Sequence, residues 1–302
     1  MGNYKWILGV FLIGLGCSDC PLDNAGNQAK TNESENLKLW YEHPAGDVWE
    51  EALPLGNGRL GAMVYGNPSK EILQLNEETV WSGGPSRNDN PKAKAALSKI
   101  RELIFAGEYA KAQKLAGKTI QSTQNNGQIY QPVGNVYLEF PGHEHPKYYK
   151  RELNLENAIA TTQYKVAGVT YTREAFISIP DQIIVMKLLA DKPGQLSFTA
   201  SMDAPQLIYG KKQIDSQAIK IQTNSSGNLE LSGTTSDHEG VNGQVKFSAL
   251  AHIKTKNGKT NSTANTIKVK NADEATLYIS IATNFKNYEN LGGDEKELSN
   301  SY

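Results

Sequence analysis

Cysteine is absent from most of this sequence, since both cysteines, Cys17 and Cys20, lie among the first twenty of its 302 residues. The remainder therefore holds neither a disulfide framework nor a zinc site with thiolate ligands. A net charge is missing too, because 31 basic residues oppose 32 acidic ones and leave a formal charge of −1. Such a chain has no field that favours nucleic acid or an anionic surface, so we expect a neutral partner.

Signatures of several chemistries are also missing. No Gly-x-Ser-x-Gly turn, phosphate-binding glycine loop or calcium-loop pattern occurs. The two histidines of the His-Glu-His triplet at 143–145 could share one face, but no third metal ligand lies nearby. We therefore expect a polar turn there, and we predict no metal site and no cofactor.

The N-terminus has the pattern of an export signal. Lys5 supplies a positive charge ahead of an apolar run at 6–15, which is too short for a membrane-spanning helix of about 20 residues. Gly16-Cys17 resembles the site at which bacterial lipoproteins are cleaved and acylated. The match is imperfect, because such signals usually carry leucine three residues before the cysteine, where Gly14 stands here.

We therefore expect residues 1–20 to form a lipoprotein signal with Cys17 as the lipidated residue. Ordinary signal cleavage is the alternative. Either predicts export, to the periplasm or cell surface of a Gram-negative bacterium, and the membrane would be contacted only through a lipid anchor. Residues 21–36 contain almost no large apolar side chain, so they are expected to be a disordered tether.

From residue 37 onward the apolar pattern is that of a mainly β protein. Short alternating segments between turn residues predict strands at 37–41, 60–65, 72–75, 136–140, 159–166, 169–178, 183–189, 196–202, 218–222, 229–231, 245–254, 266–269 and 276–282. So many short strands indicate a large antiparallel β-sandwich. We expect residues 37–290 to form a single domain of this kind.

One helical segment interrupts the β pattern. Asn90 is a suitable helix cap and Pro91 suits the first helical position, after which apolar residues recur on one face. Gly107 ends this helix, and an Ala-rich second helix follows at 109–118. The two predict a small αα-hairpin inserted between strands.

A further helix start stands near the end of the sequence. Asp294 at a cap position, with Glu297 three residues later, is typical of a helix N-terminus. The few residues after Asp294 are fewer than the ~12 that an isolated helix needs. We therefore expect 291–302 to begin a linker helix that leads to a further domain.

Several long blocks carry a resemblance to a known family. They read WEEALPLGNGRLGAMVYG, LQLNEETVWSGGP, YQPVGNVYLEFPG, YKRELNLENAIATTQYKVAGVTYTREAFISIPDQIIVMKL and ATNFKNY, within residues 37–290. In this order they resemble the N-terminal domain of glycoside hydrolase family 95, the α-L-fucosidases, which also include some α-L-galactosidases. The resemblance implies a β-supersandwich followed by a linker and an (α/α)6 barrel.

The resemblance also implies where the chemistry lies. In that family the barrel supplies a glutamic acid that protonates the leaving oxygen, and asparagines, supported by an aspartate, that position water for inversion. None of those motifs occurs in this sequence, so we assign no catalytic residue and expect this chain alone to release no fucose. The implied partners are the C-terminal barrel and a fucosylated oligosaccharide or another plant or host glycan.

The segment 53–85 is rich in glycine, asparagine and tryptophan, which suits a sugar site. Aromatic faces pack against the C–H side of a pyranose while amide, guanidinium and carboxylate groups bind its hydroxyls. The candidate substrate-binding residues are Trp49, Asn57, Arg59, Asn76, Glu77 and Trp81. In the alternative interpretation, the glycines shape tight turns and the tryptophans seal the sandwich against a neighbouring domain.

Three functions remain open on the sequence alone. The first is the N-terminal β-domain of an exported α-L-fucosidase-like hydrolase, which supports and edges the sugar cleft of the barrel. The second is a free-standing carbohydrate-binding sandwich at the cell surface that cleaves nothing. A purely structural lipoprotein is a third.

Overall fold

The computed structural model describes residues 37–302 apart from 123–126, 205–207 and 210–211. Residues 37–302 form one compact unit. The predictions of an export signal, of lipidation at Cys17 and of a tether fall on residues 1–36, which lie outside the described residues. Within the described part, no helix has both the length and the apolar character needed to cross a bilayer.

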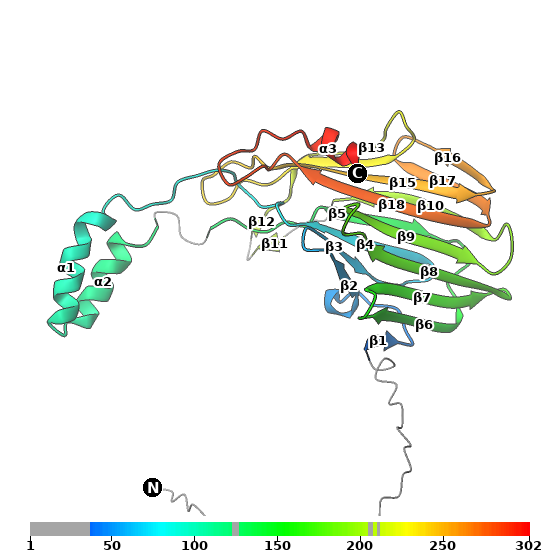
Figure 1. The fold of residues 1–302 in the computed structure, drawn as a ribbon, viewed down its shortest axis with the longest axis horizontal. Helices are drawn as coiled ribbons and strands as arrows, with labels where there is room; N and C mark the ends of the chain where they lie inside the picture. The colour runs from blue at the N-terminus through cyan, green and yellow to red at the C-terminus, as the bar shows by residue number, and fades with distance from the viewer. Residues whose placement is uncertain (1–36, 123–126, 205–207, 210–211) are drawn as a thin grey trace, which may run out of the picture. The chain divides into compact units, whose positions relative to one another are not determined.

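Two large antiparallel sheets make up the fold (Figure 1). The nine-stranded sheet runs in the order β1 (Lys38–Tyr41), β6 (Lys147–Asn154), β7 (Ile159–Val166), β8 (Val169–Ile177), β9 (Ile183–Ala190), β18 (Glu274–Thr283), β15 (Lys246–Lys256), β14 (Leu229–Thr234), β13 (Gln217–Thr223). The seven-stranded sheet runs β16 (Lys259–Ser262), β17 (Thr266–Ala272), β10 (Leu196–Asp203), β5 (Gly134–Glu139), β4 (Lys70–Glu77), β3 (Leu60–Val64), β2 (Leu53–Gly56). A two-residue pair, β11 (Ile208–Tyr209) and β12 (Lys212–Gln213), stands apart.

The core lies between the inner faces of the two sheets. Alternation places every second residue of a strand inward, so Leu73 and Leu75 of β4 are buried, as are Leu277 and Ile279 of β18. Both pairs belong to one continuous apolar cluster that draws on both sheets. The predicted β-sandwich is therefore confirmed.

A buried ion pair crosses this core. Glu71 of β4 and Arg173 of β8 both point inward, and a carboxylate oxygen of Glu71 accepts a 2.8 Å hydrogen bond from Arg173 Nη1. Arg173 also donates to the carbonyl oxygens of Asn67 and Pro68 and to the Tyr164 hydroxyl. Because its hydrogen-bond partners come from both sheets, this guanidinium links them.

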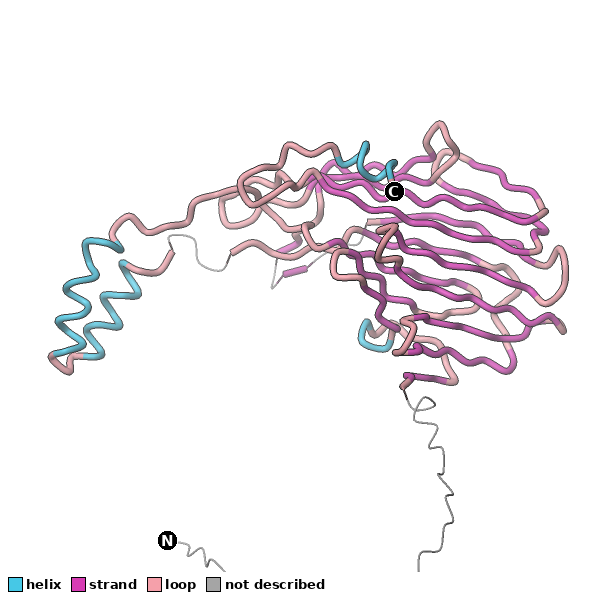
Figure 2. The backbone as a smooth tube through the Cα atoms, in the orientation of Figure 1, coloured by secondary structure: helices cyan, strands magenta, loops and turns pink. Residues whose placement is uncertain are grey.

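The predicted αα-hairpin is confirmed and lies between β4 and β5 in the chain. Helices α1 (Ala93–Phe105) and α2 (Tyr109–Thr119) pack side by side (Figure 2), with a turn at Gly107, where φ is +75°. The first helix begins two residues later than predicted, and Asn90 accepts a hydrogen bond from the Lys92 amide. The buried apolar residues of the hairpin are Ile100 of α1 and Ala112 of α2, whereas Phe105 is 88% exposed.

The predicted helix at the end of the sequence is also present. Asp294 caps α3 (Glu295–Ser301) by accepting hydrogen bonds from the amides of Lys296 and Glu297. This helix packs on β15 and β18, on the outer face of the nine-stranded sheet. Its Ser299 carbonyl accepts a 2.6 Å hydrogen bond from Ser280 of β18.

Five strands escaped the sequence analysis: β2, β6, β11, β12 and β16. β6 is the longest of them, and it pairs with β1 and β7 inside the nine-stranded sheet. Its inward positions include Arg151, which is fully buried and donates to the carbonyl oxygens of His43 and Glu51 while its guanidinium stacks on Tyr41. A charged residue at an inward position removes the apolar alternation that a strand normally shows.

Candidate functional site

A pocket of about 350 Å³ opens beside Trp81, where the chain leaves β4. Residues far apart in the sequence line it: Glu78, Thr79, Trp81, Ser82, Gly84, Pro85, Ser86, Gln128, Val245, Phe285, Tyr288 and Leu291. A second hollow of about 460 Å³ shares Pro85, Ser86 and Tyr288 with it and adds Arg87 and Glu289. The two hollows therefore adjoin, and together they form a groove.

Trp81 is held firmly at the edge of this groove. Its indole Nε1 donates a 2.9 Å hydrogen bond to the Glu78 carbonyl, and its ring meets Tyr130 edge to face at 5.4 Å. A backbone bridge also pairs Trp81 with Tyr130. The indole nevertheless stays 44% exposed. An aromatic side chain that is fixed yet open is suited to stacking against a sugar.

Glycine is favoured at position 83 by a positive φ and at positions 83 and 84 by two glutamine side chains that pack closely against them. Gly83 has φ +69°, and a Cβ there would lie 2.4 Å from the Gln128 side chain, while a Cβ at Gly84 would lie 2.6 Å from that of Gln244. The Gly83 backbone bonds to Ser236 and to Gln244 at 2.8 Å each. At these glycines the segment after Trp81 packs against the loops that carry Gln128 and Gln244.

Asn76 and Glu77 hold residues next to Trp81 in place through hydrogen bonds to Tyr130 and Thr79. Asn76 Oδ1 accepts a 3.0 Å hydrogen bond from the Tyr130 hydroxyl, which in turn contacts Trp81. Glu77 is buried, and one oxygen accepts hydrogen bonds from the Thr79 amide and hydroxyl at 2.8 and 2.7 Å. Desolvation raises the pKa of Glu77, while the hydrogen bonds from Thr79 and the nearby Arg59 charge oppose that rise.

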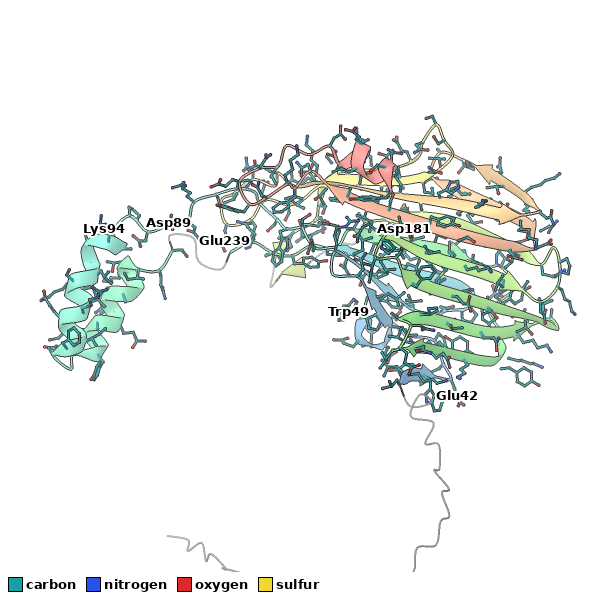
Figure 3. All side chains as sticks on the ribbon, in the orientation of Figure 1. Glu42, Trp49, Asp89, Lys94, Asp181 and Glu239 are labelled. Carbon is teal, nitrogen blue, oxygen red and sulfur yellow. The ribbon has the colours of Figure 1, made fainter. Side chains whose placement is uncertain are left out.

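Asn57 and Arg59 are directed toward the protein. Arg59 donates to the side chain and carbonyl of Gln182 and to the Ile281 carbonyl at 2.8 to 3.1 Å. Asn57 donates to the Ser178 carbonyl and accepts from two backbone amides of its own turn. Both residues thus fasten the β2–β3 turn to the β8–β9 turn, in which Asp181 is labelled in Figure 3. Arg59 Nη1 also lies 3.6 Å from Glu77 Oε1, so it connects these two turns to the residues next to Trp81.

Trp49 lies elsewhere in the chain's architecture. It begins a short 3-10 helix, η2 (Trp49–Glu51), between β1 and β2, and it is 50% exposed (labelled in Figure 3). It does not line the pocket beside Trp81. Of the six predicted residues, the structure brings Asn76, Glu77 and Trp81 together, attaches Asn57 and Arg59 to that group through structural bonds, and leaves Trp49 outside.

Two aromatic residues of the groove were not predicted. Phe285 and Tyr288 follow β18, about 200 positions after Trp81 in the sequence, and complete the pocket. The block ATNFKNY contains both, but no local pattern shows that it folds beside Trp81. Only the antiparallel path of β18 beside β15 and β9 brings this segment to the same end of the sandwich.

The structure offers no metal cluster in the part of the chain it describes, since no three His, Cys, Asp or Glu side chains gather suitably there. In the His-Glu-His triplet, His143 turns inward, stacks on Phe140 and lies 2.9 Å from the Tyr164 hydroxyl. Burial, and then the Arg173 charge, lower the pKa of His143 to about 4. The expected polar turn therefore contains a core histidine that is neutral at pH 7.

Comparison with known proteins places this sandwich among the β-domains that glycoside hydrolases carry. The chain belongs to the family described as glycosyl hydrolase family 65, N-terminal domain, which matches residues 39–288. The predicted resemblance to the N-terminal regions of α-L-fucosidases is confirmed by the relatives that follow, although the family itself carries the number 65.

Named relatives agree with this assignment. The chain is 35% identical over 270 residues to "Alpha-L-fucosidase 2" of Arabidopsis thaliana, which covers 83% of this chain and 31% of the relative. It is 27% identical over 272 residues to "Probable alpha-fucosidase A" of Aspergillus niger, covering 85% of this chain and 31% of the relative. The chain thus spans about a third of the length of these relatives.

A solved structure shares the fold. "Putative kojibiose phosphorylase from human microbiome" aligns with a TM-score of 0.51 at 9% identity, covering 89% of this chain and 34% of that one. At this identity the likeness concerns the fold alone. The chain is therefore a glycoside-hydrolase-associated β-sandwich domain that is homologous to the N-terminal regions of α-fucosidases.

Proposed function

We propose that this chain is the N-terminal domain of an exported α-L-fucosidase-like glycoside hydrolase, and that its groove beside Trp81 forms one edge of the sugar-binding cleft. Hydrolysis of α-L-fucosyl linkages, with inversion, belongs in this proposal to a helical barrel domain joined to it. The support is the fucosidase names of relatives about three times as long as this chain.

The observation that carries the proposal is the groove itself. Trp81 and Tyr288 offer aromatic faces, and Ser86 and Gln128 supply a hydroxyl and an amide group beside them, whereas the buried Ser82 hydroxyl is bonded to Gln128 Oε1 and the Ile129 amide. Such a mixture of aromatic faces and few polar groups is typical of a site that orients a neutral sugar. A fucosylated oligosaccharide from a plant or host glycan is the ligand that fits the relatives' names.

The proposal also holds that this domain does not cleave the bond alone. Inverting hydrolysis needs an acid and a base about 6.5 to 9.5 Å apart across the sugar. Among the described residues that line the groove, Glu78 in the pocket beside Trp81 and Glu289 in the adjoining hollow carry carboxylates, and the proposal assigns the acid and the base to the barrel instead. The neighbouring Glu77 is buried and bonded to Thr79. We expect the chain by itself to release no nitrophenol from an aryl α-L-fucoside, and steady release above a boiled control would contradict this.

The sugar contact is tested by titration of the chain with a fucosylated oligosaccharide such as 2′-fucosyllactose in a calorimeter. Removing the indole in Trp81→Ala takes away roughly 50 Å² of apolar contact, worth about 1.3 kcal/mol, so affinity should fall about tenfold. Trp49→Ala is the matched control, because Trp49 is equally exposed but lies outside the pocket. The groove would drop out of the proposal if both variants lost the same affinity for the sugar, or if both bound it as tightly as the wild type.

Export and lipidation at Cys17 form a separate part of the proposal. Cells that express the full chain and are fed an alkyne fatty acid should label it, and Cys17→Ala should abolish the label. Cys20→Ala should keep it, because only the first cysteine follows the small residue at the cleavage site. Label that survives Cys17→Ala would show that this assignment is wrong.

A further inference from the structure

A second pocket lies on the outer face of the nine-stranded sheet, beside α3. Its volume is about 280 Å³, and the strands β9, β15 and β18 supply its floor while Ser299, Asn300 and Tyr302 bound it from the side of α3. It shares no lining residue with the groove beside Trp81. It is therefore a separate cavity.

Two aromatic rings form a stacked pair, the aromatic platform, in this pocket. His252 of β15 and Tyr278 of β18 are direct cross-strand partners, so both side chains stand on the same outer face. Their ring centroids are 6.3 Å apart and their planes differ by 27°, so the rings are stacked with a tilt. A ligand in the pocket therefore meets the free face or the edges of this ring pair.

Polar groups without formal charge surround the platform. His252 Nδ1 lies 2.8 Å from Asn228 Oδ1, and because an amide oxygen only accepts, Nδ1 donates and Nε2 is left as an acceptor. Asn300 anchors its Nδ2 on the Lys296 carbonyl at 2.7 Å, which directs its oxygen elsewhere. The lining includes no Lys, Arg, Asp or Glu. A charged ligand would find no counter-charge here.

We infer that this pocket is a second binding site, for an uncharged sugar residue, in which the C–H face of a pyranose packs against the ring pair of Tyr278 and His252 while amide groups and His252 Nε2 bind its hydroxyls. The volume is close to the lower limit of ligand pockets, about 300 Å³, which suits one monosaccharide unit. The site shares no lining residue with the groove proposed to contact the catalytic cleft, so it would hold a sugar residue independently of that groove.

The test uses NMR to measure saturation transfer from the full chain to the neutral sugars L-fucose, D-galactose and D-xylose. It is done in the Trp81→Ala background, so that signal from the first groove does not enter. Expected is saturation transfer to at least one sugar with an affinity on the order of 1 mM, as for other single sugar units with few contacts. Adding Tyr278→Ala should lower that affinity at least tenfold, whereas Tyr278→Phe, which keeps the ring, should change it less than threefold.

His252→Ala serves as a second variant, because this exposed side chain can be removed without disturbing the core, and it should weaken binding about threefold to tenfold. Thermal midpoints of all variants verify folding. No transfer to any of the three sugars, or equal binding with and without the Tyr278 ring, would overturn the inference. Binding of phenol in preference to every sugar would overturn it as well, since it would show a general aromatic cavity. The first groove could still pass or fail its own titration.

Discussion

The buried pair of Glu71 and Arg173 gives the sharpest test of what holds the two sheets together. We consider Glu71→Gln, which keeps the shape of the side chain and removes its charge. One Glu71 oxygen accepts from Arg173, and the other accepts from the Gly66 amide at 2.7 Å and the Ile72 amide at 3.2 Å. A glutamine must turn its NH₂ group toward one of these donors, and Arg173 keeps a charge that nothing nearby balances.

The expected cost follows from this geometry. Removing one partner of a buried pair typically costs about 3–5 kcal/mol, because an uncompensated charge stays inside. A whole domain is stable by only about 5–15 kcal/mol. The variant should therefore lose a fifth or more of its stability, and its melting temperature should fall by roughly 10 °C.

Urea unfolding followed by tryptophan fluorescence measures the effect. The control is Glu102→Gln, because Glu102 pairs with Lys99 at 2.8 Å on the exposed surface of α1. Surface pairs are worth about 0–1 kcal/mol, so this variant should unfold almost as the wild type does. If both variants lose the same small amount of stability, the view that the Glu71 charge joins the sheets is wrong.

Two other properties can be checked in the same assay. The pKa of His143, lowered to about 4 in the folded state, lies below its unfolded value of about 6.5, so the unfolded state binds a proton first and stability falls as the pH drops from 6.5 to 4. His143→Gln should reduce that fall by up to about 3 kcal/mol, and an unchanged pH profile would refute the assignment. Gly134→Ala should destabilise the chain by more than about 2 kcal/mol, since a Cβ there would lie 2.6 Å from the Asp203 carbonyl oxygen. Gly117 lies in α2, where an added Cβ would have no neighbour within 4 Å, so Gly117→Ala should stabilise the chain by up to about 1 kcal/mol. If Gly134→Ala stabilised the chain as well, the packing at Gly134 would have been misjudged.

Apolar inward residues made most strands predictable, as in β9 and β18, whose central positions on the shared core are isoleucine, leucine and methionine. There are exceptions, because β8 was predicted although its Arg173 points inward, and β2 was missed although Leu53 and Leu55 are buried. β6 departs from this pattern, because Arg151 takes an inward position, where it donates to two backbone carbonyls and stacks on the Tyr41 ring while its Nη2 has no hydrogen-bond partner. A periodicity argument cannot detect a charged residue that a distant loop makes acceptable.

The candidate site shows a similar division. Trp81 could be singled out, because a tryptophan followed by serine and two glycines marks a special turn. The structural role of Asn57 and Arg59 could not be predicted, because their polar groups can bind a sugar as well as the carbonyl groups of Ser178 and Gln182. Tyr288 could not be placed beside Trp81 at all, because that proximity depends on the path of a whole sheet.

The helical hairpin has a consequence for how this domain can vary. β4 and β5 are direct neighbours in the seven-stranded sheet, with Leu75 opposite Gly134, so their ladder forms without any help from the helices between them. The hairpin itself buries little, chiefly Ile100 and Ala112. Its amides should exchange with deuterium long before those of the sheets. A short loop in its place would leave both sheets intact, and this position is therefore where descendants of one sandwich can gain or lose an attachment without refolding.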